Sequence, residues 1–134
     1  MKVYSLLVIV AVVSCLAACK KEQPPYENHF TQERIVRYEL YTTKDFSDES
    51  NNIQFSLTMR KVGKTLFDST LATMKISEIP DSAHRIIIER RVPRNDTSRL
   101  AVGFDYAIEN VGNSWYVDEF PAGDTLKVVR FSFK

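Results

Sequence analysis

Alternation of apolar and polar side chains with a period of two residues is the feature that most restricts how this chain can fold. It is cleanest over residues 53–60, where Ile53, Phe55, Leu57 and Met59 are separated by polar side chains. The same pattern covers residues 100–109 and 129–134, and a weaker one covers 36–40. Successive side chains of a β-strand point to opposite faces, so the pattern predicts strands with one buried and one solvated face.

Turn-forming residues separate these predicted strands. Clusters of Gly, Pro, Asn, Asp and Ser occur at residues 48–52, 62–63, 80–82, 93–98, 110–113 and 121–124. Shorter strand candidates lie at 65–68, 71–77, 85–91 and 114–120, and no mature segment of ten residues has the 3.6 period of a helix. The chain is therefore predicted to be all-β, an antiparallel β-sandwich of about 7–8 strands, immunoglobulin-like or C2-like, with a small barrel as the alternative.

The amino-terminal end has the layout of a secretory signal peptide. Lys2 precedes an apolar run at residues 3–14, and small residues follow it. A transmembrane helix needs ~20 apolar residues, and Lys20 and Lys21 interrupt the run before that length is reached. Residues 1–18 are therefore predicted to be a cleaved leader.

The leader closes on Leu16-Ala17-Ala18-Cys19, which resembles the lipobox of bacterial lipoproteins. The resemblance covers the first 19 residues. It implies that the Cys19 thiol receives a diacylglycerol, that the leader is cut before Cys19, and that the new amino group is acylated. Two or three acyl chains anchor a protein durably to a membrane. The expected location is the bacterial cell envelope, the outer membrane rather than the inner, with the domain in the periplasm or on the cell surface.

The mature chain divides into a short tether and one domain. Residues 19–32 are polar and contain two prolines, so they are predicted to be the lipidated cysteine and a flexible tether. Residues 33–134 are the predicted β-sandwich domain. Cys15 leaves with the leader, so no disulfide can form in the mature chain. Loss of Lys2 leaves equal numbers of basic and acidic residues, which argues against a nucleic-acid partner.

No pattern of catalytic or metal-binding residues stands out. His29 falls in the tether and His84 follows a turn, and no serine lies in a G-x-S-x-G elbow. Two separated histidines without a cysteine argue against zinc. Acidic residues at 45–49 and 118–124 resemble the loops of C2-like calcium sites, but they are also ordinary turn formers. We expect no enzyme activity, no cofactor and no metal.

Five arginines gather around one predicted hairpin. Arginine forks suit phosphate and sugar-acid oxygens, so this cluster is a candidate for binding an envelope glycolipid. The alternative is a charged edge that prevents strand association. The cluster consists of Arg85, Arg90, Arg91, Arg94 and Arg99.

A second candidate is the aromatic stretch at 114–120. The alternation places Trp115 with Val117, and Tyr116 with Asp118. Because a buried carboxylate needs a partner, the face of Asp118 is predicted to be solvated, and Trp115 is predicted to be in the core. The possible ligand-binding residues are then Tyr116, Asp118, Arg90, Arg91 and Arg94.

A pairing register also follows if residues 94–98 connect two strands of one hairpin. Ile88 then faces Phe104 and Ile86 faces Tyr106 on the core side, with Ile87 and Asp105 on the other face. Separately, Asp81-Ser82-Ala83 and Asp124-Thr125-Leu126 resemble the acceptor of one type of bacterial O-linked glycan, which leaves modification of Ser82 or Thr125 open.

Two functions from different classes fit these features. The leading hypothesis is a non-enzymatic, lipid-anchored interaction or assembly module that binds other envelope proteins. The alternative is a module that binds carbohydrate or glycolipid through the Trp115 and arginine regions. Exposure of Trp115 and Tyr116 would favour the second hypothesis.

Overall fold

The structure, a computed structural model, describes residues 32–93 and 96–134. The predicted leader, Cys19, nearly all of the predicted tether and Arg94 lie outside the described residues. Residues Thr31–Lys134 form one compact unit. Among the described residues there is no helix with the length and hydropathy needed to cross a membrane.

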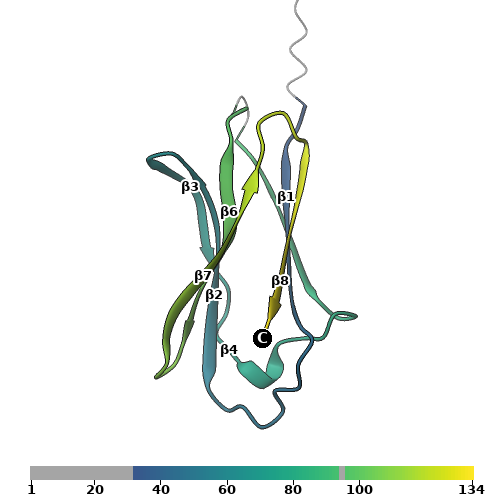
Figure 1. Cartoon of the computed structure of the whole chain (residues 1–134), viewed down its shortest axis with the longest axis vertical. Helices are drawn as coiled ribbons and strands as arrows, with labels where there is room; N and C mark the ends of the chain where they lie inside the picture. Colours follow the sequence, from purple (N-terminus) through teal and green to yellow (C-terminus); the bar gives the residue numbers. More distant parts are fainter. Residues whose placement is uncertain (1–31, 94–95) are drawn as a thin grey trace, which may run out of the picture. The chain divides into compact units, whose positions relative to one another are not determined.

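Eight strands and one short helical turn make up the described domain (Figure 1). Burial along the central strands follows the alternation in the sequence, since every second side chain over most of their length is buried. The elements are β1 (Ile35–Thr42), β2 (Asn52–Lys61), β3 (Lys64–Thr70), β4 (Met74–Lys75), η1 (Ile76–Glu78), β5 (Ile86–Arg91), β6 (Leu100–Ile108), β7 (Gly112–Phe120) and β8 (Leu126–Phe133).

These strands form two sheets that pack face to face, which confirms the predicted all-β sandwich of about eight strands. The smaller sheet has the order β5-β1-β8, and the larger has the order β3-β2-β6-β7 with β4 paired to β2. One pair departs from the predicted antiparallel arrangement: β8 runs parallel to β1, with Leu40 opposite Phe131. The turn after β7 carries the chain into the smaller sheet, so β8 arrives beside β1 in the same direction.

The predicted hairpin of residues 85–91 with residues 100–108 is wrong in its pairing. β5 pairs with β1, where Ile88 faces Tyr38 and Ile86 faces Leu40, while β6 pairs with β2 and β7. The face assignments are nevertheless confirmed, because Phe104 is buried and Ile87 is 55% exposed. Alternation specifies which face of a strand each side chain takes. It does not specify the partner strand, because pairing β5 with β1 buries the same face as pairing it with β6 would.

Aromatic rings fill the space between the sheets. Phe104 of β6 packs edge-on against Tyr38 of β1, with ring centres 5.6 Å apart. The Tyr38 hydroxyl donates a hydrogen bond of 2.7 Å to the Thr58 carbonyl on the opposite sheet, and burial raises the pKa of this hydroxyl. Phe131 of β8 completes the layer against Phe104 at 5.5 Å. The core therefore ties the two sheets both by apolar contact and by a buried hydrogen bond.

One buried arginine organises an end of the sandwich. Arg34 is only 6% exposed, and its guanidinium lies 4.2 Å from the centre of the Phe120 ring. Its N–H groups donate hydrogen bonds of 2.8–2.9 Å to four backbone carbonyls. The acceptors belong to Asp96, Ser98, Pro121 and Asp124. Arg34 thus links the start of β1 to two of the connections that cross between the sheets, the one after β5 and the one after β7.

Candidate functional site

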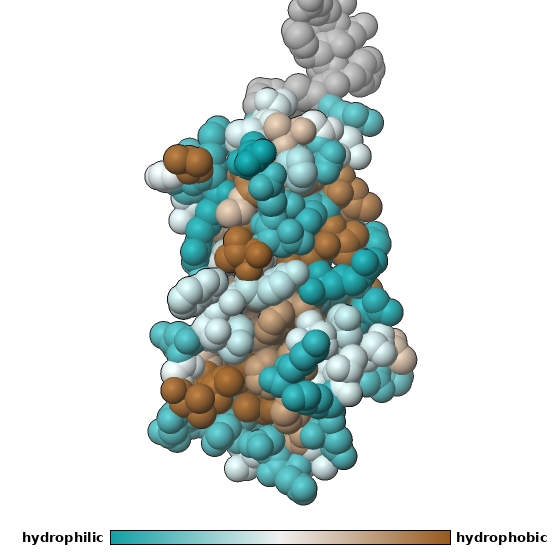
Figure 2. Space-filling view, viewed as in Figure 1, coloured by the Kyte–Doolittle hydropathy of each residue, from teal (hydrophilic) through white to brown (hydrophobic). Residues whose placement is uncertain are grey.

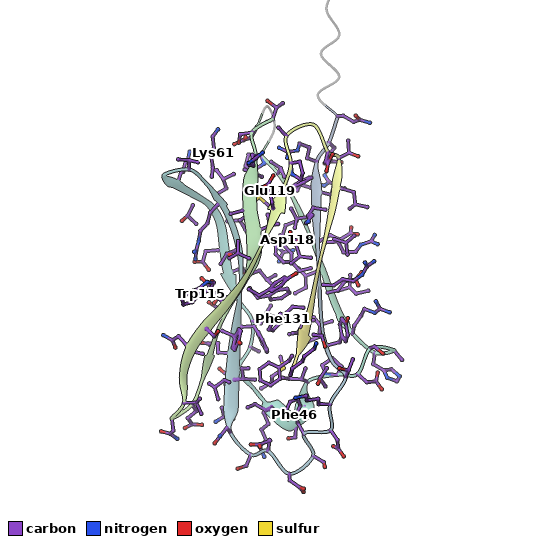
Figure 3. All side chains as sticks on the ribbon, viewed as in Figure 1. Phe46, Lys61, Trp115, Asp118, Glu119 and Phe131 are labelled. Atoms are coloured by element: carbon purple, nitrogen blue, oxygen red, sulfur yellow. The ribbon has the colours of Figure 1, made fainter. Side chains whose placement is uncertain are left out.

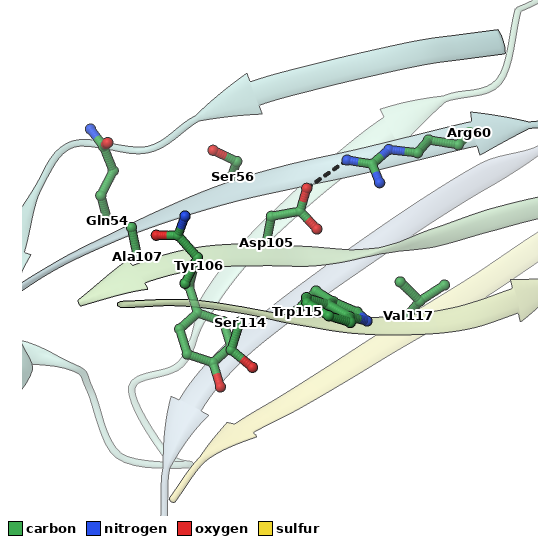
Figure 4. A pocket seen from close by; sticks show the side chains of 10 residues that line it. Gln54, Ser56, Arg60, Asp105, Tyr106, Ala107, Ser114, Trp115 and Val117 are labelled. Carbon is green, nitrogen blue, oxygen red and sulfur yellow. Dashed lines mark hydrogen bonds and ion pairs between the residues drawn. The ribbon is translucent and has the colours of Figure 1, made fainter. Parts of the chain in front are cut away.

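The outer face of the larger sheet carries a hollow of about 570 Å³ over β2, β6 and β7. Figure 4 shows Trp115 and Val117 of β7 on one side of this hollow and Gln54, Ser56 and Arg60 of β2 on the other. Asp105 of β6 lies between them. The hollow is open to solvent and is lined entirely by residues of regular strands.

Trp115 dominates the hollow, and the prediction that it belongs to the core is wrong. Its side chain is 72% exposed, and it stands on the outer side of the larger sheet whereas Phe131 lies between the sheets (Figure 3). The register of β6 with β7 explains this orientation. Trp115 lies opposite Asp105, and Tyr116 lies opposite the fully buried Phe104. Residues opposite each other share a face, so Tyr116 points inward and Trp115 outward.

The inward face of β7 accepts Asp118 because this carboxylate has a partner. The Lys127 ammonium on β8 lies 2.7 Å from Asp118 Oδ2. The hydrogen bond from Lys127 is the main cause that holds the pKa of Asp118 below its ordinary value. Tyr116, two residues earlier, packs its ring 5.4 Å from that of Phe131. The sequence argument failed because it assumed that Asp118 had no partner, and Lys127 lies on the other sheet.

Small residues on the outer face of β6 leave little side-chain bulk between β2 and β7. Gly103 has no space for a side chain, since an added Cβ would lie 1.9 Å from the Tyr116 carbonyl oxygen. On the same face of β6, Ala101 and Asp105 flank Gly103, and Ala107 follows Asp105. Tall side chains on β7 and β2 therefore border a shallow strip along β6.

Polar groups in the hollow can exchange hydrogen bonds with a ligand. Arg60 Nη2 donates to Asp105 Oδ2 at 2.5 Å, and no hydrogen bond to Oδ1 of Asp105 is made by the described residues. Gln54 Nε2 donates to the Thr73 hydroxyl at 3.3 Å, which is a long contact. Asn113 adds an exposed amide near the start of β7. The hollow thus places an aromatic plane next to carboxylate, amide and guanidinium groups.

A second hollow of about 560 Å³ continues from the first along β7. Arg60 and Val117 line both hollows, so the two adjoin, and together they are called the trough below. In the second hollow Arg99 pairs with Glu119 at 3.1 Å. The trough follows β7 from Asn113 to Glu119, which corresponds to about 20 Å of extended strand. Its length suits a chain-like ligand better than a single small molecule.

The arginine cluster is not brought together with Tyr116 and Asp118. Arg90 lies over the Phe67 ring at 5.1 Å, and Arg91 pairs with Glu33 at 3.0 Å. Both arginines are on β5, and the contact of Arg90 with Phe67 places β5 next to β3. β5 and β3 are at one border of the sandwich, and β7 and β8 are at the other. Arg94, the remaining candidate of that group, lies outside the described residues.

The other two arginines of the cluster are also apart from each other. Arg85 pairs at 3.0 Å with Glu39, which is buried, and Arg130 of β8 reaches the same oxygen at 3.3 Å. Arg99 belongs to the trough on the other sheet. The described arginines therefore serve mainly separate ion pairs, consistent with a charged border on β5.

Three of the remaining sequence candidates, Ser82, His84 and Thr125, do not line the trough. His84 is exposed, with Nδ1 2.9 Å from Asp81 Oδ1. Ser82 is exposed in the same turn, and Thr125 is half-buried. His29 lies outside the described residues. Within residues 32–93 and 96–134, no group of three or more His, Cys, Asp or Glu side chains is placed to hold a metal ion.

The polar trough residues that sequence reasoning missed include Gln54, Ser56, Arg60, Asp105 and Asn113. A partial signal existed, because the alternation already assigned Gln54, Ser56 and Asp105 to the solvated faces of their strands. What was missing was the pairing of β2 with β6, which places Ser56 opposite Asp105.

No protein-family model matches this chain, and no significant match to it occurs among the curated proteins or the solved structures. The described domain is thus defined by its own features: an all-β sandwich of two sheets, with an exposed tryptophan in an open trough on the larger sheet.

Proposed function

We propose that this protein is a carbohydrate-binding module, anchored in the bacterial envelope by lipid on Cys19. The observation that carries the binding function is the exposure of Trp115, 72% of whose surface is accessible within a polar hollow. A large aromatic ring left in water forgoes the stabilisation that burial would bring. An indole in this position is well suited to receive a ligand.

The surroundings of Trp115 favour a sugar over a purely apolar ligand. A pyranose ring has an apolar face of C–H bonds, which can stack on indole, and an edge of hydroxyl groups. Oδ1 of Asp105 can accept a hydrogen bond from a hydroxyl, while Asn113 can both donate and accept. Elsewhere on the face seen in Figure 2, apolar side chains form separate areas between hydrophilic ones. The trough therefore offers both surfaces that a sugar needs.

The carboxylates of the trough favour binding without hydrolysis. Asp105 is engaged by Arg60 at 2.5 Å and Glu119 by Arg99 at 3.1 Å. Glycoside hydrolysis needs one carboxylic acid that gives its proton to the leaving oxygen. An arginine held against each carboxylate works against that role.

The anchor rests on the lipobox resemblance of residues 16–19. A lipid-tethered domain at the envelope meets polysaccharides and glycolipids at high local concentration, so moderate affinity for each sugar chain is sufficient. The interaction or assembly function, with envelope proteins as partners, is the second candidate and is supported by the free border of β7 described below.

The binding proposal is tested with full-length protein in detergent micelles on an array of bacterial and plant glycans, followed by titration calorimetry with the best ligand. Trp115→Ala should weaken binding at least ~10-fold, the equivalent of about 1.4 kcal/mol. Ile87→Ala is the matched control, since Ile87 is an exposed apolar side chain on the other sheet. Unchanged binding by Trp115→Ala, or no binding of the parent to any glycan, would contradict the proposal.

The anchor is tested by labelling cells with radioactive palmitate. Cys19→Ser should lose the label and leave the leader uncleaved or the protein released from the membrane. Cys15→Ser is the control and should be labelled like the parent. If Cys19→Ser retained the label, the lipid would have to be attached at another residue.

A further inference from the structure

Besides the two-residue β4, four strands border the two sheets, and three of these four carry features that discourage pairing with another chain. β3 faces a register shift at Met59 and Arg60 of β2, β5 carries Glu89, Arg90 and Arg91, and β8 carries Lys127 and Arg130. Bulges and charged side chains are the usual protection of sheet borders. β7 differs in where its charges lie: Asp118 and Glu119 are adjacent near its end, and its first six residues, 112–117, contain no charged residue and no proline. Its pairing with β6 also has no register shift.

The backbone of β7 presents free hydrogen-bonding groups at this border. The Tyr116 carbonyl is turned towards Gly103 of β6, as the 1.9 Å approach to an added Cβ at Gly103 shows. The N–H and C=O groups of Trp115 and Val117 therefore point away from β6. Among the described residues, no backbone group outside the sheet ladder bonds to Trp115 or Val117. Within the described part of the chain, one outward backbone group of β7 has a side-chain partner: the Glu119 N–H donates to Asp118 Oδ1 at 2.7 Å.

We propose that β7 pairs antiparallel with β7 of a second copy of this chain, about a two-fold axis at Tyr116. Tyr116 is the midpoint of Gly112–Phe120, so this register uses the whole strand. It places Trp115 opposite Val117 of the second copy and Asn113 opposite Glu119 of the second copy. All four side chains are on the outer face, and their backbone groups point outward, as hydrogen-bonded antiparallel pairs require.

The side chains of β7 complement those of a second copy in this register. Glu119 meets the Asn113 amide and Asp118 meets the Ser114 hydroxyl, so no two like charges lie opposite each other. Trp115 meets Val117, an aromatic and β-branched pair of the kind that stabilises antiparallel strands. The contact is isologous, because each copy supplies the same surface and the pairing closes at two chains. It also unites the two larger sheets, with both Trp115 side chains on one face.

The proposal is tested by disulfide cross-linking of the full chain in membranes of the expressing cells. The double variant Asn113→Cys/Glu119→Cys places two cysteines of different copies in a hydrogen-bonded pair, with Cα atoms about 5.5 Å apart. This separation is suitable for a disulfide. Either single variant is the matched control, since its cysteines in the two copies would be about 20 Å apart. Both positions are exposed, so folding should be retained.

Oxidation should give a covalent dimer from the double variant and none above the parent level from either single variant. A double variant that yields no more dimer than the single variants would overturn the proposal, and a protein partner of another kind would then be the occupant of β7. Adding Val117→Pro to the double variant removes an outward N–H and should abolish the dimer, whereas Val117→Ala should retain it. Persistence of the dimer in a folded Val117→Pro variant would also overturn the pairing. The cross-linking readout does not depend on glycan binding. The pairing of β7 and the proposed binding function can therefore be confirmed or contradicted independently.

Discussion

Asp118 is tolerated on the inward face of β7 because Lys127 reaches it from the other sheet, with 2.7 Å between Nζ and Oδ2. The pair holds the pKa of Asp118 below its ordinary value of 3.8, chiefly through the hydrogen bond from Lys127. A carboxylate with a lowered pKa in the folded state stabilises the fold above its unfolded-state pKa. That contribution is lost as the pH falls through the lower folded-state pKa.

Replacing Lys127 by Met should therefore raise the pKa of Asp118 towards 3.8 and lower stability at neutral pH. The loss relative to the parent should shrink as the pH is lowered below 4. Carbon-detected NMR titration gives the pKa, and urea unfolding at several pH values gives the stability. Lys44→Met, on an exposed loop, is the control. An unchanged Asp118 titration in Lys127→Met would refute this account.

Gly103 is needed because the backbones of β6 and β7 approach closely. A Cβ at this position would lie 1.9 Å from the Tyr116 carbonyl oxygen, and backbone cannot yield as a flexible side chain can. Gly103→Ala should therefore destabilise the domain by ~1–3 kcal/mol, the usual cost of overpacking. Ala101→Ser, an exposed position on the same face of β6, should change stability by less than about 0.5 kcal/mol. Equal unfolding midpoints for Gly103→Ala and the parent would show that the strands can separate freely.

At the scale of elements, Arg34 joins β1 to the connections that follow β5 and β7. Its four carbonyl acceptors belong to residues 96, 98, 121 and 124. Hydrogen bonds to a charged group contribute about 1.5–3 kcal/mol each, and the contributions of one side chain overlap. These two of the four connections between the sheets thus depend on one side chain as well as on apolar packing.

Arg34→Met keeps the contact with Phe120 but removes all four donors, so it should cost at least ~3 kcal/mol of unfolding free energy. Arg34→Lys should recover little, because an ammonium cannot reproduce the planar fork. Arg91→Met is the control, since the Arg91 side chain is 78% exposed. Chemical denaturation followed by far-UV circular dichroism measures all three. If Arg34→Met lost no more unfolding free energy than Arg91→Met, the stabilising role of the four Arg34 hydrogen bonds would be contradicted.

At the scale of the whole molecule, the sole tryptophan lies outside the core, while most phenylalanine and tyrosine rings of the described residues pack in it or against it. The native protein should therefore show red-shifted tryptophan emission that acrylamide quenches freely. Unfolding should change this emission little, whereas near-UV circular dichroism of the tyrosine and phenylalanine cluster should change strongly. A blue-shifted, protected emission would mean that Trp115 is covered, either by the core or by a second copy at β7. Repeating the measurement with Val117→Pro separates these two cases, because only the second depends on pairing.

The sequence by itself determined the strands and, in most of them, the buried face. Ile53, Phe55 and Leu57 are buried where alternation predicts, because side-chain direction in a strand is a local property with a period of two. The turns could be predicted for the same reason, since Gly, Pro and Asn act through their own backbone preferences. β7 was the exception, where Asp118 reversed the assignment.

Tertiary structure alone decided which strands meet. β5 joined β1 instead of β6, and Asp118 found Lys127 across the sandwich, since both outcomes depend on contacts between residues far apart in the sequence. The trough is of the same kind: Ser56, Asp105 and Trp115 come from three strands, and no local pattern links them. Burial energy selects the face of each strand, but the choice of partner is made by the packing of the whole domain.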